Sequence, residues 1–123
     1  MSDSAPASND MIATLTACAQ ALYDKKAENL KVLHLGEKSS VADYFILATG
    51  MSDPHLRALA IETEKCLDSR GVQILGAERT TKSGWVVVDA GDFMVHIFTR
   101  EMRGHYNLEG LWKDADLVTL KLT

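Results

Sequence analysis

Two apolar runs separated by only three residues constrain the fold of this chain more than any other feature of its sequence. Residues 85–89 and 93–98 flank the short connection 90–92, which contains a glycine. Because so short a connection joins neighbouring antiparallel strands, the pattern predicts a β-hairpin. The residues that follow, 100–113, predict one or two short helical turns that close over the hairpin.

Two longer segments have the spacing of amphipathic helices. Residues 9–27 carry apolar side chains at helical intervals, and Asn9 is a suitable N-cap. A second helix is predicted over residues 53–70, with Asp53 as its N-cap and Pro54 at its first helical position. Gly71 supplies the stop signal at its end.

The sequence predicts strands in three further segments. Residues 30–35 and 43–49 are rich in β-forming residues, and the second is apolar enough to predict burial on both faces. Residues 72–75 predict a third strand, which precedes the hairpin. A turn is expected at 36–40, between the first two of these strands, and a loop at 80–84, just before the hairpin. The order predicts an α/β (α+β) fold with a mixed sheet of about five strands and helices packed on it.

The length of 123 residues suits a single domain. We expect this domain to span residues 9–113, preceded by a disordered lead at 1–8 and followed by a tail at 114–123 whose role the sequence does not assign. No apolar run approaches the length of a membrane helix, and residues 1–10 have no pattern of a secretory or transit peptide. A cytoplasmic location is therefore expected, with no membrane partner.

Cysteine content and charge exclude several functions. Cys18 and Cys66 lie among apolar residues without metal-ligand spacing, which predicts buried free thiols. The formal net charge of -4 disfavours binding to nucleic-acid phosphates, which requires clustered basic residues. If the partner is a nucleoprotein, we expect contact with its basic protein surface and little direct contact with RNA.

The hairpin and the turns after it collect the residue types that dominate protein interfaces. Trp85, Arg103, Tyr106 and Trp112 all occur within this stretch. Tryptophan, tyrosine and arginine bury a large area per immobilised side chain and retain a polar group. This composition favours a binding protein over an enzyme.

The same residues carry a resemblance to a known family. The positions concerned are 43–50, Ser52, His55, Glu78, Trp85, Asp89, Gly91, Asp92, Val95, His96, Phe98, Arg103, Tyr106, Leu108, Glu109, Leu111 and Trp112. In these two separated blocks, and over about residues 10–113, the chain resembles the Iojap family of ribosomal silencing factors.

This resemblance implies a fold related to nucleotidyltransferases but without their catalysis. It also implies binding to the large ribosomal subunit at ribosomal protein fourteen, which blocks association with the small subunit and represses translation when nutrients are limiting. Family members often form homodimers when free. Relatives in mitochondria and plastids are tied to large-subunit assembly, which is the alternative function.

Seven residues are the candidate contacts with the ribosomal protein. Trp85, Ala90, Tyr106 and Leu108 are expected to form an apolar centre, while Asp89 and Glu109 meet basic groups, with Arg103 beside them. Structural roles are the alternatives. Trp85 and Trp112 suit core aromatics, Arg103 suits a solvated helix surface or a pair with Glu101 or Asp92, and His96 suits a structural histidine.

An enzyme is the principal rival class. Asp43, Asp89 and Asp92 are the carboxylates that could hold magnesium, but the chain lacks a phosphate-holding signature ahead of an acidic pair. Four histidines, His34, His55, His96 and His105, show neither helical ligand spacing nor a cysteine companion. We therefore expect no catalytic activity, no metal and no cofactor.

Overall fold

A computed structural model of the chain describes residues 9–36, 42–78, 83–113, 115–120 and 122. Its elements in order are α1 (Asn9–Asp24), β1 (Glu28–His34), β2 (Tyr44–Gly50), α2 (Asp53–Ser69), β3 (Gly76–Glu78), β4 (Trp85–Asp89), β5 (Phe93–Thr99), α3 (Arg100–Tyr106), α4 (Leu108–Leu111) and β6 (Asp116–Val118). The expected disordered lead at 1–8, most of the turn at 36–40 and most of the loop at 80–84 lie outside the described residues.

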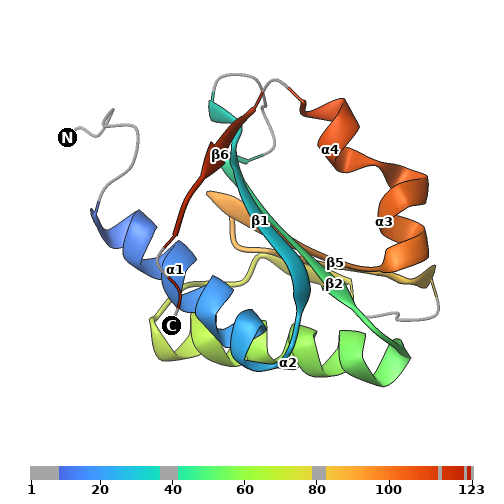
Figure 1. Cartoon of the computed structure of the whole chain (residues 1–123). Helices are drawn as coiled ribbons and strands as arrows, with labels where there is room; N and C mark the ends of the chain where they lie inside the picture. Colours follow the sequence, from blue (N-terminus) through green and yellow to red (C-terminus); the bar gives the residue numbers. More distant parts are fainter. Residues whose placement is uncertain (1–8, 37–41, 79–82, 114, 121, 123) are drawn as a thin grey trace.

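The strands form one mixed sheet in the order β3-β4-β5-β2-β1-β6 (Figure 1). β2 and β5 pair in parallel, and the other neighbours pair antiparallel. The predicted hairpin is confirmed, with Trp85 opposite Phe98 and Asp89 opposite Met94. The predicted fold class is also confirmed, and the sheet has one strand more than expected.

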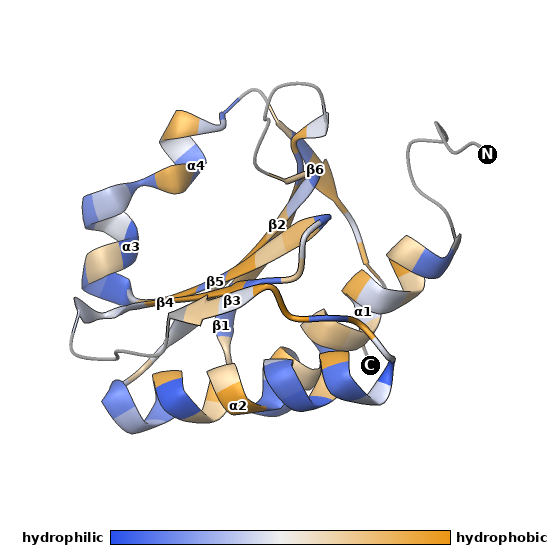
Figure 2. Cartoon of the chain, turned by 180° about the vertical axis from the view of Figure 1, so that it is seen from behind, coloured by the Kyte–Doolittle hydropathy of each residue, from blue (hydrophilic) through white to orange (hydrophobic). Residues whose placement is uncertain are grey.

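β2 lies inside the sheet, and all seven of its residues are buried, as its apolar sequence predicted. Side chains alternate between the two faces along a strand, so β2 supplies both cores. Tyr44, Ile46 and Ala48 belong to a first cluster, and Phe45 and Leu47 belong to a second one. In Figure 2 the strands carry most of the hydrophobic colour.

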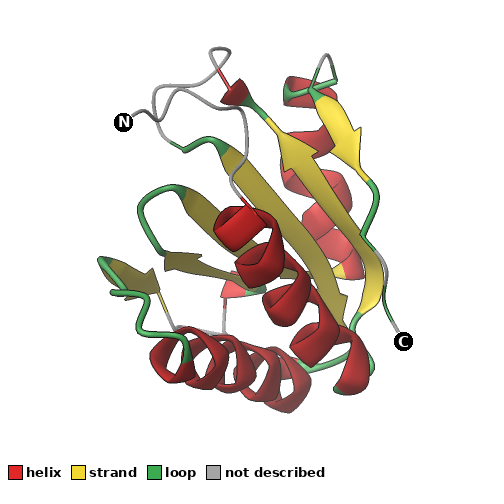
Figure 3. Ribbon diagram, turned by 90° about the vertical axis from the view of Figure 1, so that its left-hand side faces the viewer, coloured by secondary structure: helices red, strands yellow, loops and turns green. Residues whose placement is uncertain are grey.

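Helices cover both faces of the sheet. Leu15 and Leu22 of α1 and Leu56 and Leu67 of α2 pack into the first cluster. On the other face, Met102 of α3 and Leu108 of α4 pack against the second cluster. Figure 3 shows the sheet between the two helix pairs.

The N-cap of α2 differs from the prediction by one residue. Ser52, not Asp53, has extended backbone, and its Oγ accepts a hydrogen bond from the backbone N–H of His55 at 3.3 Å. Asp53 is instead the first residue of the helix, where its negative charge interacts favourably with the free backbone N–H groups of the first turn. The predicted stop is confirmed, since Gly71 has a positive φ of 72° directly after Arg70.

The strand predicted at residues 72–75 is wrong. Val72 and Ile74 are half-buried against the first cluster, but this segment has no strand pairing. The ladder begins afterwards, with Gly76 opposite Asp89 in β4. Before it, the Leu75 backbone N–H donates to the Asp89 carbonyl of β4 at 2.8 Å, but the apolar residues at 72–75 otherwise reflect packing on the core.

The C-terminal segment that the sequence left unassigned extends the sheet. Residues Asp116–Val118 form β6, in which Val118 pairs with Val32 and Asp116 with His34 of β1. Val118 and Leu120 also pack against the first cluster. The sixth strand thus closes one side of β1.

Cys18 and Cys66 are free thiols, as predicted. Cys18 is fully buried in the first cluster, whereas Cys66 is half-buried beside it. Burial raises the pKa of the Cys18 thiol well above its ordinary value. In the part of the chain that the structure describes, no helix combines the length and the apolar character needed to cross a membrane.

Candidate functional site

Gly84, directly before β4, lies against the start of α3. Gly84 has a positive φ of 76°, and a Cβ there would come within 2.6 Å of the Met102 Cγ. The backbone N–H of Thr99 donates to the Gly84 carbonyl at 2.9 Å. A glycine is therefore required where the loop meets α3, and it holds the next residue, Trp85, in place.

Trp85 and Tyr106 are brought together, as the sequence predicted. Their ring centroids are 4.4 Å apart, and Trp85 also stacks on Phe98 at 5.4 Å. Trp85 is half-buried, while Tyr106 is 43% exposed. The two rings thus form an aromatic surface that is accessible to a partner at the Tyr106 side.

His96 holds the indole of Trp85 in place through a hydrogen bond. The Trp85 Nε1–H donates to His96 Nδ1 at 3.1 Å, so the neutral imidazole carries its proton on Nε2. His96 is 4% exposed, and its Nε2 has no hydrogen-bond partner among the described residues. Burial lowers the pKa of His96 to about 4, which keeps the ring neutral at pH 7.

Leu108 and Trp112 attach α4 to the sheet. Both are half-buried against the second cluster, which also contains Trp85 and Met102 at its margin. The Trp112 ring meets Phe45 edge-on at 6.1 Å between centroids. Trp112 therefore has the anchoring contact that was its structural alternative.

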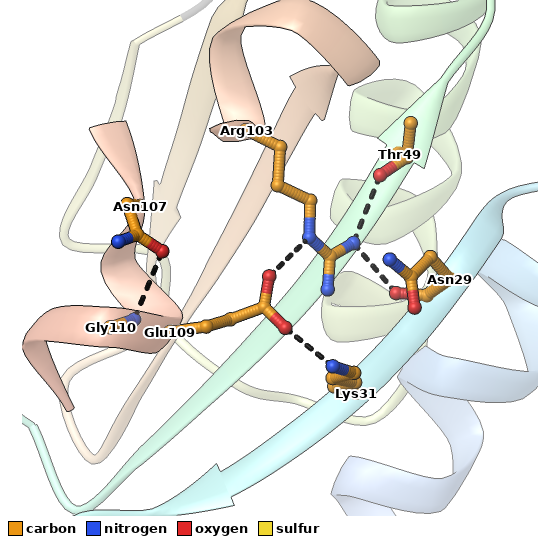
Figure 4. Close-up of polar contacts among 7 residues, drawn as sticks. All are labelled: Asn29, Lys31, Thr49, Arg103, Asn107, Glu109 and Gly110. Carbon is orange, nitrogen blue, oxygen red and sulfur yellow. Dashed lines mark hydrogen bonds and ion pairs between the residues drawn. The ribbon is translucent and has the colours of Figure 1, made fainter. Parts of the chain in front are cut away.

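Arg103 and Glu109 form an internal ion pair, which the sequence did not predict (Figure 4). The Arg103 Nε donates to the Glu109 Oε1 at 2.9 Å, while the Lys31 Nζ donates to the Glu109 Oε2 at 2.5 Å. The suggested pairs of Arg103 with Glu101 or Asp92 are wrong. Hydrogen bonding to Arg103, and then to Lys31, holds the pKa of Glu109 below its ordinary value although partial burial opposes this shift.

The same arginine also fastens α3 to two strands. Its Nη1 donates to the Asn29 carbonyl at 2.6 Å and to the Thr49 Oγ1 at 2.9 Å. Asn29 has a positive φ of 51° and lies where the β1–β2 register shifts between Glu28 and Lys31. This irregularity leaves a strand carbonyl for Arg103, as a β-bulge does.

Asp89 and Ala90 are not brought to Trp85. Their end of β4 is roughly 13 Å from its start, at about 3.3 Å per residue. The Asp89 Oδ1 accepts a hydrogen bond from the Gly91 backbone N–H at 2.9 Å, which stabilises the hairpin turn. Ala90 packs against the first cluster, on the opposite face from the aromatic surface.

Sequence reasoning missed two residues that belong to this region. Leu111 in α4 is 70% exposed, which makes it an accessible apolar side chain beside the predicted set. Lys31 shares Glu109 with Arg103 although it lies 78 residues away in the sequence. Only the apolar character of Leu111 was a detectable signal, because a pairing across 78 residues leaves no local pattern.

The described residues hold no group of three or more His, Cys, Asp and Glu side chains that could bind a metal ion. Asp43 and Asp92 are neighbours at the starts of β2 and β5, where the Asp43 backbone N–H donates to the Asp92 carbonyl at 2.8 Å. Their proximity comes from this backbone contact. It does not create a carboxylate cluster.

Comparison with known proteins gives a consistent result across sequence and structure. A family model described as "Ribosomal silencing factor during starvation" matches residues 8–123. The chain is 42% identical over 106 residues to "Ribosomal silencing factor RsfS" of Bacillus subtilis (strain 168), covering 86% of this chain and 90% of that protein.

Two other similarities bear on function and fold. "Mitochondrial assembly of ribosomal large subunit protein 1" of Mus musculus is 29% identical over 94 residues, which cover 74% of this chain and 41% of that protein. A crystal structure of a protein from Chromobacterium violaceum superimposes with a TM-score of 0.78 and 31% identity, covering 90% of this chain and 92% of that one.

Proposed function

This chain belongs to the RsfS family of ribosomal silencing factors, and we propose that it binds the large ribosomal subunit and keeps the small subunit from joining it. Translation would then be repressed when nutrients are limiting, as the family name indicates. The observation that carries the proposal at the residue level is the contact of Trp85 with the exposed Tyr106. Such rings are typical anchors of protein interfaces.

The proposed partner is ribosomal protein fourteen of the large subunit. A net charge of -4 favours a basic protein surface over bare RNA, so direct RNA contact should be small. Trp85, Tyr106 and Leu108 form the proposed apolar centre of the interface, with Leu111 added from its exposure. The cytoplasm is the proposed place of action.

The charged residues take different parts in this proposal. Arg103 and Glu109 bind one another, so their proposed role is to hold α3 and α4 in the orientation that the partner contacts. Asp89 would be reached at the far end of β4, whereas Ala90 packs on the opposite face and has no part in this interface. A standard interface buries about 800 Å² on each partner, which is broad enough to include both ends of a short strand.

Sedimentation with isolated ribosomal subunits tests the proposal. The wild-type chain should move with the large subunit and lower the yield of joined ribosomes. The double variant Trp85→Ala, Tyr106→Ala should restore joining, because truncating a central aromatic costs about 2 kcal/mol or more of binding free energy, about 30-fold in Kd. Circular dichroism should report an unchanged fold.

Tyr23→Ala is the matched control. Tyr23 is 51% exposed, but it lies on α1, which covers the other face of the sheet. This variant should block joining as well as the wild-type chain does. If the double variant also blocks joining fully, the interface lies elsewhere.

Large-subunit assembly is the second candidate function, and the printed name of the mouse relative supports it. Both functions require binding to the large subunit, so the two are separated in cells. Loss of the protein should cause large-subunit precursors to accumulate under rich nutrients if assembly is its task. Silencing alone predicts normal subunits and excess translation only after nutrients run out.

Two further parts of the proposal are that the protein acts without catalysis and that it forms a homodimer when free. Magnesium-dependent nucleotide turnover that Asp89→Ala abolishes would contradict the first part. Light scattering of the purified chain tests the second part, since a monomer at all concentrations would contradict it.

A further inference from the structure

α1 and α2 lie side by side on the first-cluster face of the sheet and run in opposite directions (Figure 1). Two polar contacts join the helices. The Arg70 Nε donates to the Thr14 Oγ1 at 3.4 Å, and the Lys25 Nζ lies 3.9 Å from the Glu62 Oε1. These contacts fix which residues of the two helices face one another.

The two cysteines of the chain lie between these contacts. Cys18 is one helical turn after Thr14, and Cys66 is one turn before Arg70, so antiparallel packing brings the two side chains face to face. The Cys18 thiol is hydrogen-bonded to Cys66, in agreement with this register. The two sulfur atoms are therefore neighbours although they are far apart in the sequence.

The packing of two helices is compatible with a bond between these sulfur atoms. Packed helices have axes roughly 8–10 Å apart, and their Cα atoms lie about 2.3 Å from each axis. Facing residues on such helices therefore have Cα atoms about 4–6 Å apart, which lies within the range that a disulfide spans.

The two thiols differ in their access to solvent. Cys18 is fully buried in the first cluster, whereas Cys66 is half-buried at its margin. Burial, and then the neighbouring Cys66, raise the pKa of the Cys18 thiol, so Cys18 keeps its proton at pH 7. A small oxidant should therefore react with Cys66 first.

We propose that Cys18 and Cys66 form a modification site, at which hydrogen peroxide converts the two thiols into a disulfide that links α1 to α2. The Cys66 sulfur, as its thiolate, attacks one peroxide oxygen, which breaks the O–O bond and leaves Cys66 as a sulfenic acid. The departing hydroxide takes up the proton that Cys66 had lost and becomes water.

The second step joins the two helices. The Cys18 sulfur displaces the hydroxyl group of the sulfenic acid, and the Cys18 proton leaves with that hydroxyl as a second water. Direct contact of the two sulfur atoms favours this step although Cys18 holds its proton tightly. The two thiols together lose two electrons and two protons, which reduce one hydrogen peroxide to two waters.

A dithiol reductant reverses the modification, and in a reducing compartment the pair stays as free thiols. The cysteines belong to the first-cluster face, whereas Trp85 packs on the second cluster. The site is therefore independent of the proposed ribosome contact.

Mass spectrometry of the full chain tests the proposal. The reduced protein is treated with a small excess of hydrogen peroxide, then unfolded and alkylated with iodoacetamide. The wild-type chain should lose the mass of two hydrogen atoms and take up no alkyl group, and dithiothreitol should make both thiols available again. The product should remain a single chain on a non-reducing gel.

Single variants separate the roles of the two thiols. Cys18→Ala leaves Cys66 without a partner, so dimedone should trap a sulfenic acid at Cys66. Cys66→Ala is the matched variant and leaves only the buried Cys18, which should stay reduced over the same time. A Cys18 that reacts as fast as Cys66 would contradict the proposed order of steps.

The disulfide should also raise the melting temperature by about 10 °C, because it closes a long loop in the unfolded chain. Circular dichroism of the peroxide-treated wild-type chain measures this shift. Peroxide-treated Cys66→Ala has the same methionines and should show no such increase. The proposal would be overturned by thiols that both remain alkylatable, by a disulfide between two chains, or by oxidation that low urea accelerates, since only unfolded molecules would then react.

Discussion

Arg103 carries a permanent positive charge to a position that is only 7% exposed. It keeps this charge because Glu109, Thr49 and the Asn29 carbonyl all offer oxygen atoms within 2.9 Å. A buried charge without such partners would cost several kcal/mol. Arg103 therefore fastens α3 and α4 to the sheet. The stability of this attachment depends on Glu109.

Replacing that partner should destabilise the protein in a pH-dependent way. Glu109→Gln should lower the free energy of unfolding by about 1–3 kcal/mol at pH 7, since the charge of Arg103 loses its counterion. The pKa of Glu109 is lowered in the folded chain. The loss should therefore be complete above about pH 4.3, the ordinary value for glutamate, and should shrink as the pH falls through the lowered pKa.

Urea denaturation of both proteins from pH 7 to pH 3 measures this difference. Glu101→Gln changes an exposed glutamate of the same helix α3 and is the matched control. It should alter stability by no more than about 0.5 kcal/mol. An effect of Glu109→Gln that does not depend on pH would show that the ion pair is not its cause.

His96 should make the fold sensitive to mild acid. Burial lowers its pKa to about 4, so between pH 6.5 and pH 4 the unfolded chain binds a proton that the folded chain does not. Stability should therefore fall with decreasing pH by about 1.4 kcal/mol per unit over this range. His96→Gln should remove this part of the slope, whereas His105→Gln, at an exposed position on α3, should keep it.

Urea midpoints at pH 7, 6 and 5 are sufficient to compare the three proteins. The wild-type chain should lose about 2 kcal/mol more than His96→Gln between pH 7 and pH 5. Parallel pH profiles for the wild-type chain and His96→Gln would mean that unfolding does not change the protonation of His96.

At the scale of elements, the segments with strong local patterns are those that the sequence predicted. β2, α2 and the β4–β5 hairpin each have a run of apolar residues and a stop signal within a few positions. Residues 72–75 have the run, but only Leu75 bonds to β4 and the ladder runs over 76–78, because pairing is decided by which backbone lies alongside. For the same reason β6 could not be assigned, since its partner β1 lies more than 80 residues earlier.

The N-cap of α2 should contribute measurably to stability. Ser52→Ala removes the acceptor of the His55 N–H, which should lower the free energy of unfolding by about 1 kcal/mol. Thermal unfolding followed by circular dichroism measures the change. Ser52→Asp restores an acceptor and should recover most of the loss, whereas equal loss in both variants would argue against a capping role.

At the scale of the whole molecule, only part of the candidate site could be predicted. The contact of Trp85 with Tyr106 follows from a hairpin closed by a helix, since the first residue of β4 and the turns after β5 meet at one end. Alternation of side chains separates Ala90 from them, and the length of β4 separates Asp89. The Arg103 network could not be predicted, because Asn29 and Thr49 lie 74 and 54 residues away from Arg103 in the sequence.

Removing residues 116–123 should affect both stability and solubility. Val118 and Leu120 would lose their contact with the first cluster, which should lower the free energy of unfolding by about 2 kcal/mol. The freed side of β1 would present unpaired backbone groups to other chains. Denaturation and light scattering should detect the two effects, and Leu117→Ser, at a 66% exposed position, should cause neither.

The parallel pairing of β2 with β5 determines how late during synthesis a new chain can complete its sheet. β2 is buried on both sides, yet its parallel neighbour ends only at Thr99, after α2, β3 and β4 have been made. Contacts between segments so far apart form late, because the intervening chain must first be ordered. A nascent copy therefore has to keep its most apolar strand from aggregating until most of its length has left the ribosome that made it.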